Sequence, residues 1–204
     1  MTGASGCAYG IRLIEALLDG GYEVHLVITD AGWRVLREEA GWDAARRKEE
    51  LDRRFGGALS DGRIRYYPTA DVGASIASGS FLTEGMVIAP CSMGTLAAIA
   101  NGASDNLLER AADVILKEGR RLLLLPRETP LHAIHLENML KLARLGVRIV
   151  PAMPAFYYHP ASIRDMIDFM VGKLLDNMGI EHDLYRRWGD DGHGGGARDH
   201  GRPD

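Results

Sequence analysis

The fold of this chain follows from one stretch, Gly85-Met86-Val87-Ile88-Ala89-Pro90-Cys91-Ser92-Met93-Gly94-Thr95-Leu96-Ala97-Ala98-Ile99-Ala100. Its apolar start is typical of a strand buried on both faces, and Pro90 is expected to stop that strand. Small and hydroxyl residues follow, and then apolar residues at helical spacing. A strand, a polar turn and a helix N-terminus together present free backbone N–H groups to an anion. The alternative is an ordinary turn with Ser92 as N-cap, and this stretch alone favours that alternative.

Similar apolar runs recur along the chain and alternate with helical patterns. Strands are predicted at residues 23–29, 86–89, 122–125 and 147–150, with a short one at residues 64–67. Helices are predicted from the residues after Gly6 to Gly20-Gly21, and at residues 30–40, 105–119, 131–145 and 162–178. This alternation predicts an α/β fold, a single-domain doubly wound parallel sheet of the Rossmann or flavodoxin-like type. Two connections are expected outside it, a charged solvated segment at residues 42–55 and a loop of small residues at 76–81.

The composition limits the class of protein. The chain has 204 residues, with 46% hydrophobic and 25% charged residues, which is ordinary for one globular domain. A net charge of −4 argues against a nucleic-acid-binding module. The two cysteines, Cys7 and Cys91, have no metal-ligand spacing, and a reduced cytoplasmic protein is therefore expected. No apolar run approaches the roughly 20 residues of a membrane span, and no secretory signal is visible.

The two ends of the chain carry separate expectations. A Gly/Ser turn, Met1-Thr2-Gly3-Ala4-Ser5-Gly6, precedes the first helix and is a weak candidate for a phosphate cradle. The buried strand expected before such a turn is missing, which suggests that the start of the sequence lies too late. Neighbouring strands would then lose ladder partners. Residues 1–188 are expected to form the domain, and the Gly- and His-rich residues 189–204 a disordered tail.

Charged side chains follow or flank the predicted strands. Arg127 and Glu128 come directly after the strand at residues 122–125, where open α/β sheets bind their ligands. A salt bridge at a helix end explains this pair equally well. Arg110 and Lys117 lie seven residues apart on one face of a helix, and two surface cations are the simpler interpretation. If the loops after the strands gather at one edge of the sheet, these four side chains form a pocket for an anionic ligand with a general acid or base in it.

Taken together, the motifs resemble those of the UbiX flavin prenyltransferase family. The similarity covers nearly all of residues 1–188, and its specificity lies in the order and spacing of the motifs. The matching pieces are Thr2-Gly3-Ala4-Ser5-Gly6 with Tyr9-Gly10, Ile76-Ala77-Ser78-Gly79-Ser80, Pro90-Cys91-Ser92-Met93-Gly94-Thr95-Leu96-Ala97, Asp105-Asn106-Leu107-Leu108-Glu109-Arg110-Ala111-Ala112-Asp113-Val114, Leu116-Lys117-Glu118, Pro126-Arg127-Glu128, Ile134-His135-Leu136-Glu137-Asn138-Met139 and Pro154-Ala155-Phe156-Tyr157.

The resemblance implies transfer of a dimethylallyl group from dimethylallyl phosphate to N5 and C6 of reduced FMN. The product, prenylated FMN, would serve UbiD-type decarboxylases. By the family's pattern, FMN would be held by Gly3, Ala4, Ser5, Thr29, Ser92, Met93, Gly94, Thr95 and Arg127. The substrate would be surrounded by Glu39, Arg110, Lys117, Arg127, Tyr157, Lys173 and Trp188. The family assembles as a dodecamer with sites at subunit contacts, so Glu39 is expected to reach a neighbouring subunit's site.

The physical chemistry of the reaction fits these roles. Breaking the allylic C–O bond leaves phosphate, so Lys117, Arg127 and Lys173 would stabilise the developing negative charge. No metal is expected, because the sequence has no Asp-rich motif for magnesium. Glu128 would be the general acid/base for ring closure, and Ser5 would assist proton movement. Tyr157 and Trp188 would shield the allyl cation with their aromatic faces.

Two substitutions depart from the family's pattern, and two other functions stay open. Lys173 stands where many relatives have Arg, which keeps the charge but loses bidentate geometry. Thr29 replaces the usual Ser and keeps the hydroxyl. One alternative is a flavin-dependent decarboxylase of the cysteine-oxidising group, and Pro126-Arg127-Glu128 and Tyr157 favour prenyl transfer over it. The other is a non-catalytic FMN carrier or accessory subunit, in which Arg110, Lys117, Glu128 and Lys173 would be superfluous.

Overall fold

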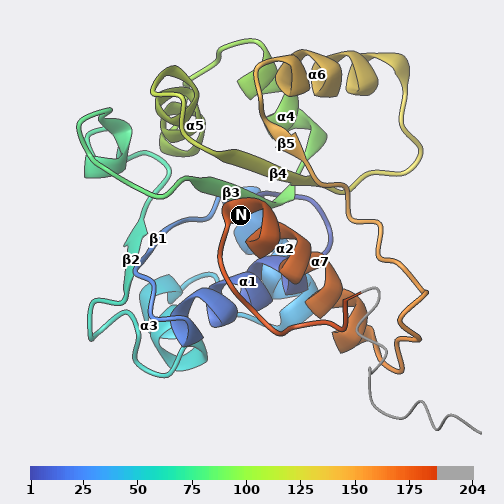
Figure 1. Ribbon diagram of the computed structural model, residues 1–204. Coiled ribbons are helices and arrows are strands. Elements are labelled where there is room, and N and C mark those ends of the chain that lie inside the picture. Colours follow the sequence, from blue (N-terminus) through green and yellow to red (C-terminus); the bar gives the residue numbers. More distant parts are fainter. Residues whose placement is uncertain (188–204) are drawn as a thin grey trace, which may run out of the picture.

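The computed structural model describes residues 1–187, and its elements alternate as the sequence predicts (Figure 1). The helices are α1 (Cys7–Asp19), α2 (Asp30–Ala40), α3 (Arg47–Arg54), α4 (Met93–Ala100), α5 (Leu107–Lys117), α6 (Ala133–Arg144) and α7 (Ile163–Met178), with a 3₁₀ turn η1 (Ser75–Ala77). The strands are β1 (Val24–Val27), β2 (Ile64–Tyr67), β3 (Met86–Cys91), β4 (Leu122–Pro126) and β5 (Arg148–Ile149).

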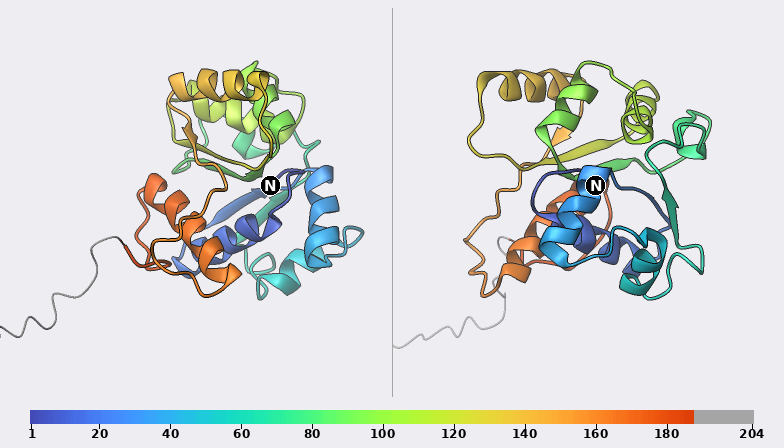
Figure 2. Two further views of the ribbon diagram at one scale, coloured as in Figure 1. Left: turned by 90° about the vertical axis from the view of Figure 1, so that its right-hand side faces the viewer. Right: turned by 180° about the vertical axis from the view of Figure 1, so that it is seen from behind.

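All the strand pairs are parallel, and helices cover both faces of the sheet (Figure 2). The side chains of β4 show how this arises, because successive residues of a strand point to opposite faces. Leu122 and Leu124 pack with α4, α5 and α6, whereas Leu123 and Leu125 pack with α1 and α7. An entirely apolar strand is therefore buried on both sides, which confirms the doubly wound α/β fold.

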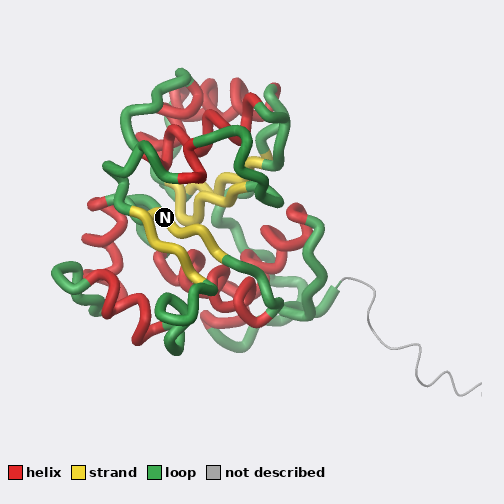
Figure 3. Tube along the Cα trace, turned by 90° about the vertical axis from the view of Figure 1, so that its left-hand side faces the viewer, coloured by secondary structure: helices red, strands yellow, loops and turns green. Residues whose placement is uncertain are grey.

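The sheet is divided into two parallel ladders, β1-β2 and β3-β4-β5 (Figure 3). Met1 and Thr2 join them at one end. The Met1 amino group donates to the Val27 carbonyl (2.7 Å), and the Thr2 N–H donates to the Pro90 carbonyl (3.2 Å). These two residues therefore occupy the position of a strand between β1 and β3.

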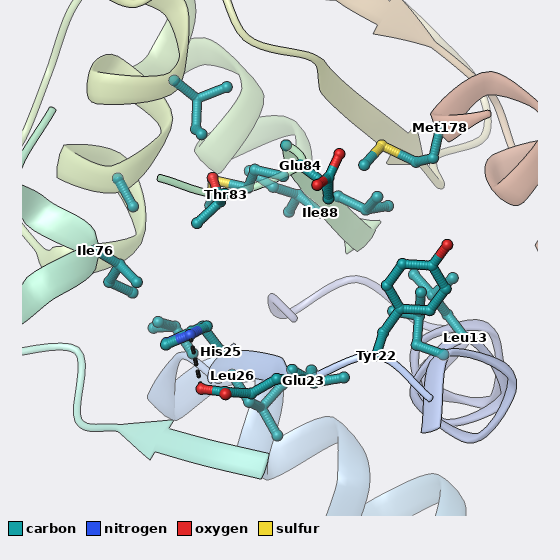
Figure 4. A pocket seen from close by; sticks show the side chains of 18 of the residues that line it. Leu13, Tyr22, Glu23, His25, Leu26, Ile76, Thr83, Glu84, Ile88 and Met178 are labelled. Carbon is teal, nitrogen blue, oxygen red and sulfur yellow. Dashed lines mark ion pairs between the residues drawn. The ribbon is translucent and has the colours of Figure 1, made fainter. Parts of the chain in front are cut away.

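Beyond Met1, a cavity of about 570 Å³ separates the facing edges of β1 and β3. Its walls are mostly apolar, with Leu26 of β1 and Ile88 of β3 on opposite sides and Leu13 and Met178 closing one face (Figure 4). His25, paired with Glu23 at 3.2 Å, lies at the β1 side. This cavity, which we call the inter-strand groove, follows the strand edges and is distinct from the loops that carry the candidate functional residues.

Several local expectations need correction. The third strand does not stop at Pro90 but continues to Cys91, with a shift of register between Ile88 and Cys91. The charged segment at residues 42–55 is less solvated than expected, because Trp42 (2% exposed) and Leu51 (0% exposed) enter the core beside α1 and α2. Charged side chains obscure this packing in the sequence.

Three further statements concern the limits of the chain. No helix within residues 1–187 is long and apolar enough to cross a membrane. The expected tail at residues 189–204 and Trp188 lie outside the described residues. The domain boundary at residue 188 stays a prediction.

Candidate active site

Three loops that follow strands are joined by hydrogen bonds at one edge of the sheet. The Thr29 N–H, after β1, donates to the Met1 carbonyl (3.1 Å). The Ser92 N–H, after β3, donates to the Thr2 hydroxyl (2.7 Å). The Arg127 N–H, after β4, donates to the Cys91 carbonyl (3.3 Å). The predicted flavin-binding loops therefore lie side by side, as parallel strands with a common carboxyl edge require.

Thr2 is a positioning residue that the sequence did not single out. Its side chain is 2% exposed, accepts the Ser92 N–H and donates its hydroxyl hydrogen to the Pro90 carbonyl at 2.8 Å. It thereby fixes the Gly3–Ser5 turn against the start of α4. In the sequence, Thr2 stands before a turn of glycine, alanine and serine and has no distinguishing pattern. Its hydrogen-bond partners, Ser92 and Pro90, become evident only in the folded chain.

The starts of α2 and α4 have the features of an anion site. Thr29 and Ser92 cap these helices by accepting the N–H groups of Gly32 (3.0 Å) and Thr95 (3.3 Å). The first N–H groups of a helix have no partner within it. At Gly94 an added Cβ would meet nothing within 4 Å, so a ligand can approach the backbone there. Ser92, Met93, Gly94 and Thr95 thus form a suitable cradle.

The start of α1 is different, because a side chain already occupies it. Glu39 accepts the N–H groups of Gly6 and Cys7, both at 2.9 Å, and the Ser5 hydroxyl. Burial alone would raise the pKa of Glu39, but these three hydrogen bonds outweigh it and lower the pKa. The sequence predicts a phosphate cradle at Met1-Thr2-Gly3-Ala4-Ser5-Gly6. This prediction needs correction for the N–H groups at the start of α1, because they bind a carboxylate of the same chain.

This contact places Glu39 within its own chain, on Ser5 and Gly6. Its expected reach toward a neighbouring subunit's site stays a prediction. Gly3 is held close to α2 in the same region, because an added Cβ would lie 2.6 Å from the Cβ of Ala31. The chain thus brings Glu39, Gly3, Ala4 and Ser5 together.

Arg127 and Glu128 lie where the sequence predicts, directly after β4. The Nε atom of Arg127 is buried and has no hydrogen-bond partner among the described residues. A buried guanidinium nitrogen without a partner is costly, so it indicates an acceptor that the chain itself does not supply. Glu128 is exposed, and its carboxylate accepts only the N–H of the adjacent Thr129 (3.0 Å) among the hydrogen bonds described for residues 1–187.

Lys117 does not join Arg127 within one copy of the chain. Lys117 ends α5 and pairs with Glu118 (2.9 Å), before β4 begins, whereas Arg127 follows the end of β4. The intervening strand spans about 16 Å at about 3.3 Å per residue. Arg110 pairs with Asp113 (3.2 Å) on the same helix. The expected gathering of Lys117 with Arg127 and Glu128 at one edge is therefore wrong for a single chain, because α5 runs opposite to the strands. Arg110 is in the first turn of α5, where the Leu107 N–H donates to the carbonyl of Thr69 beyond the end of β2 (2.7 Å).

Tyr157 lies beside α7, and Lys173 is on that helix. The Tyr157 ring is 43% exposed and makes an edge contact with Phe169, with ring centroids 6.1 Å apart. Lys173 lies 3.9 Å from Asp176 and lines a shallow pocket with Phe169, Val150 and Pro151. Trp188, the remaining residue expected to bind substrate, is outside the described part of the chain.

The site can bind an anion and move protons, but its thiols are not nucleophiles. Burial raises the pKa of both Cys7 and Cys91 to about 12, so both stay protonated at neutral pH. No cluster of metal-ligating side chains occurs within residues 1–187. The functional groups offered are backbone N–H groups, hydroxyls, the Arg127 guanidinium and the carboxylates of Glu39 and Glu128.

Comparison with known proteins places this site in a family. The model of the Flavoprotein family matches residues 1–179, and the chain therefore belongs to that family. A protein of Halalkalibacterium halodurans named flavin prenyltransferase UbiX is 58% identical over 191 residues, which cover 94% of this chain and 92% of the relative. A protein of the same name from Methanothermobacter thermautotrophicus is 51% identical over 92% of each chain. Within the flavoproteins, this chain belongs to the UbiX flavin prenyltransferase family.

Solved structures agree with this placement. The crystal structure of AnUbiX (PadA1) in complex with FMN and dimethylallyl pyrophosphate is 40% identical, with a TM-score of 0.83, and the match covers 92% of this chain and 94% of that one. A dodecameric FMN-dependent UbiX-like decarboxylase from Escherichia coli O157:H7 is 42% identical, with a TM-score of 0.81, over 92% and 99% of the two chains. A PPC decarboxylase mutant is 21% identical, with a TM-score of 0.52 over 78% of this chain and 81% of that one, and shares the fold alone.

Proposed function

We propose that this chain is a metal-independent flavin prenyltransferase that joins a dimethylallyl group to N5 and C6 of reduced FMN. The observation that carries the proposal is the Arg127 Nε atom, buried without a partner beside Glu128 at the edge where the flavin-binding loops meet. The family relationship supplies the identity of the flavin and of the allylic donor, which is dimethylallyl pyrophosphate in the AnUbiX complex.

The residues present fit FMN. The open backbone at Gly94 and the capped starts of α2 and α4 suit its phosphate, and Arg127 supplies a donor to the remaining acceptors. Ser5 and Gly3 border the same edge, where a side chain at Gly3 would crowd Ala31 of α2. When bound, reduced FMN supplies the nucleophilic atoms of the reaction. The protein's part is to orient it, to bind the leaving phosphate and to move one proton.

Glu128 holds that proton in this proposal. Its carboxylate is exposed at the edge and bonds only to the Thr129 N–H among its described contacts, so it is free to turn toward a ligand. Glu39 orients the Ser5 hydroxyl and is the second carboxylate available for proton movement. Lys117, Arg110, Lys173 and Tyr157 bind the phosphate of the donor.

The positions of those last residues favour sites shared between copies of the chain. Lys117 lies about one strand length from Arg127 of the same chain, so a neighbouring copy would have to supply it. The dodecameric Escherichia coli relative supports such an assembly, and we propose a homododecamer. We also propose a cytoplasmic location and a UbiD-type decarboxylase as the recipient of prenylated FMN.

The decisive experiment is anaerobic incubation with reduced FMN and either dimethylallyl phosphate or dimethylallyl pyrophosphate, followed by mass spectrometry of the flavin. Prenylated FMN is expected in at least one arm. An arm with an aromatic acid measures carbon dioxide release, because the Escherichia coli relative is described as a decarboxylase. Release of carbon dioxide without prenylated flavin would show that the chain is a decarboxylase and not a prenyltransferase. Unchanged FMN and no carbon dioxide in every arm would leave only the function of a non-catalytic FMN carrier.

A further inference from the structure

The C-terminal end of the described chain folds back onto α7 and is held there by one carboxylate. Residues 180–187, which we call the return segment, follow Gly179 at the end of α7. Asp176 accepts hydrogen bonds from Tyr185 Oη (2.6 Å), His182 Nε2 (3.1 Å) and Arg187 (2.8 and 3.3 Å). Three side chains of the return segment therefore converge on a single acceptor.

The protonation states of this cluster are defined by its geometry. His182 Nδ1 accepts the Leu184 N–H (3.2 Å), so Nε2 carries the hydrogen that points to Asp176. Burial by itself would raise the pKa of Asp176, but the hydrogen bonds from Arg187 and Tyr185 outweigh it and lower the pKa to about 2. Asp176 is thus a carboxylate throughout the neutral range, and the charged acceptor strengthens each bond.

Packing against the helix supports the same arrangement independently. Gly172 is buried in α7, and a Cβ added there would lie 2.5 Å from the Tyr185 ring and 2.6 Å from His182 Cε1. The two rings therefore lie directly over the helix backbone, and glycine is what lets them approach. No other residue fits at this position without moving the return segment.

The cluster also contacts two residues assigned to the substrate. Lys173 lies one helical turn before Asp176, with its ammonium 3.9 Å from the carboxylate. Tyr185 packs on Phe169 (4.9 Å between ring centroids), and Phe169 packs in turn on Tyr157 (6.1 Å). One carboxylate is therefore linked to Lys173 through charge and to Tyr157 through two ring contacts.

We propose that Asp176 is a positioning residue that clamps the return segment on α7 and thereby sets Tyr157 and Lys173 for the donor's phosphate. This inference rests on the proposed function, because it takes those two residues to bind the allylic donor. The clamp acts on the donor side of the site and leaves the flavin loops, which lie at the edge near Ser92, untouched. Breaking the clamp should therefore weaken binding of the donor and leave binding of FMN unchanged.

Two variants break the clamp by different routes. Asp176→Asn removes the charged acceptor, and Gly172→Ala displaces the Tyr185 and His182 rings while keeping Asp176. Alanine is favourable within a helix, so the second variant keeps α7 intact. Glu181→Gln is the matched control, because Glu181 is an exposed carboxylate of the return segment and is not bonded to Asp176.

Hydrogen exchange of residues 180–187 and steady-state kinetics with dimethylallyl phosphate measure the effect. Both variants are expected to speed hydrogen exchange in the return segment. For Asp176→Asn the increase is expected to be about ten- to a hundredfold, because losing hydrogen bonds to a charged group changes an opening equilibrium by about that factor. The KM for the donor is expected to rise about two- to thirtyfold, the range for residues that act through packed neighbours. The Kd for FMN and the control variant are expected to stay unchanged.

Two results would overturn the clamp. The first is exchange in the return segment that neither variant alters. The second is a released segment with an unchanged KM. A crystal structure of Asp176→Asn gives a readout without activity, in which the Tyr157 ring is expected to leave Phe169, and an unmoved ring contradicts the proposal. A wild-type chain that forms no prenylated FMN would instead refute the proposed function, while the exchange and the ring position would still decide the clamp.

Discussion

At the residue scale, Glu128 is an exposed carboxylate directly after β4. We expect Glu128→Gln to keep FMN binding and to lose about 10²–10⁴ in turnover, the usual contribution of a general acid/base. Single-turnover formation of prenylated FMN measures the loss, and fluorescence titration measures FMN binding. Glu49→Gln, at an exposed carboxylate of α3, is the control. Turnover by Glu128→Gln at the wild-type rate would remove this residue from the mechanism.

Glu39 makes stability depend on pH. Its hydrogen bonds to Ser5, Gly6 and Cys7 lower its pKa in the folded chain below that of the unfolded chain. A carboxyl group with a lowered pKa stabilises the folded chain at pH values above its pKa in the unfolded chain, which is 4.5. This stabilisation is lost as the pH falls through the lower pKa of the folded chain. Between about pH 5 and 3, the melting temperature of Glu39→Gln is therefore expected to fall less steeply than that of the wild type.

The matched control for this test is Glu38→Gln. Glu38 precedes Glu39 in α2, is 55% exposed and pairs with Arg34 on the surface. Such a surface pair contributes little, so the control should follow the wild-type curve. A Glu39→Gln curve parallel to that of the wild type would show that the α1 contact has no titrating role.

The residues of the flavin loops could be predicted from the sequence, but their connections could not. Ser92 caps α4 as its type and position indicate, whereas α2 is capped by Thr29, one residue before Asp30, which the pattern favoured. Thr2 and Asp176 carry equally important contacts, yet their partners Ser92 and Tyr185 are set by the fold and by a chain reversal. Local pattern identifies a cap because the cap's partner lies three residues away. It cannot identify a partner 90 residues away.

At the element scale, α6 has an apolar face that the rest of the described chain leaves exposed. Leu136 (53% exposed) and Leu140 (51%) lie four residues apart on one face of this helix, Ile134 (62%) lies on another side of it, and Leu145 (63%) follows it. Grouped exposed apolar side chains are typical of an interface between subunits. The helix was predicted from its spacing, but an amphipathic pattern does not show whether its apolar residues face the core or a neighbour.

We therefore expect the double variant Leu136→Asp and Leu140→Asp to sediment as a smaller species and to lose most of its turnover, because separate copies cannot share Lys117. Analytical ultracentrifugation at equal protein concentration checks the first result. Leu82→Asp is the control, since Leu82 is 82% exposed in a loop away from α6. Sedimentation of the double variant at the wild-type rate would place the interface elsewhere.

At the scale of the whole molecule, the charge balance of the proposed reaction predicts that no divalent cation is needed. Residues 1–187 contain no cluster of metal-ligating side chains. In the proposed reaction, Lys117, Arg127 and Lys173 supply the positive charge for the leaving phosphate. Turnover is expected to be unchanged by a chelator and by added magnesium. Loss of turnover in chelator with recovery in magnesium would contradict the assignment of these cations.

Met1 lies where the two ladders of the sheet meet, and its amino group titrates in the folded chain. The Met1 amino group is buried on the Val27 carbonyl, and burial lowers its pKa from 8.0 to about 5. Between these values the unfolded chain binds more protons than the folded chain, so stability rises with pH from about 5 to 8. The β1 and β3 edges that face the inter-strand groove lack a strand partner between them.

Extending the chain before Met1 by five apolar, β-branched residues is therefore expected to raise the melting temperature. The added strand converts the buried amine to a neutral amide, which keeps its N–H donor, and pairs with β1 and β3. Apolar side chains suit both faces, because α1 and α7 line one side of the groove and α5 the other. The pH dependence between 5 and 8 should flatten, and amide exchange at His25 and Val27 should slow. An extension of five Gly and Ser residues is the control, because it removes the buried amine without filling the groove. Equal melting temperatures for the two extensions would show that the groove does not accept a strand.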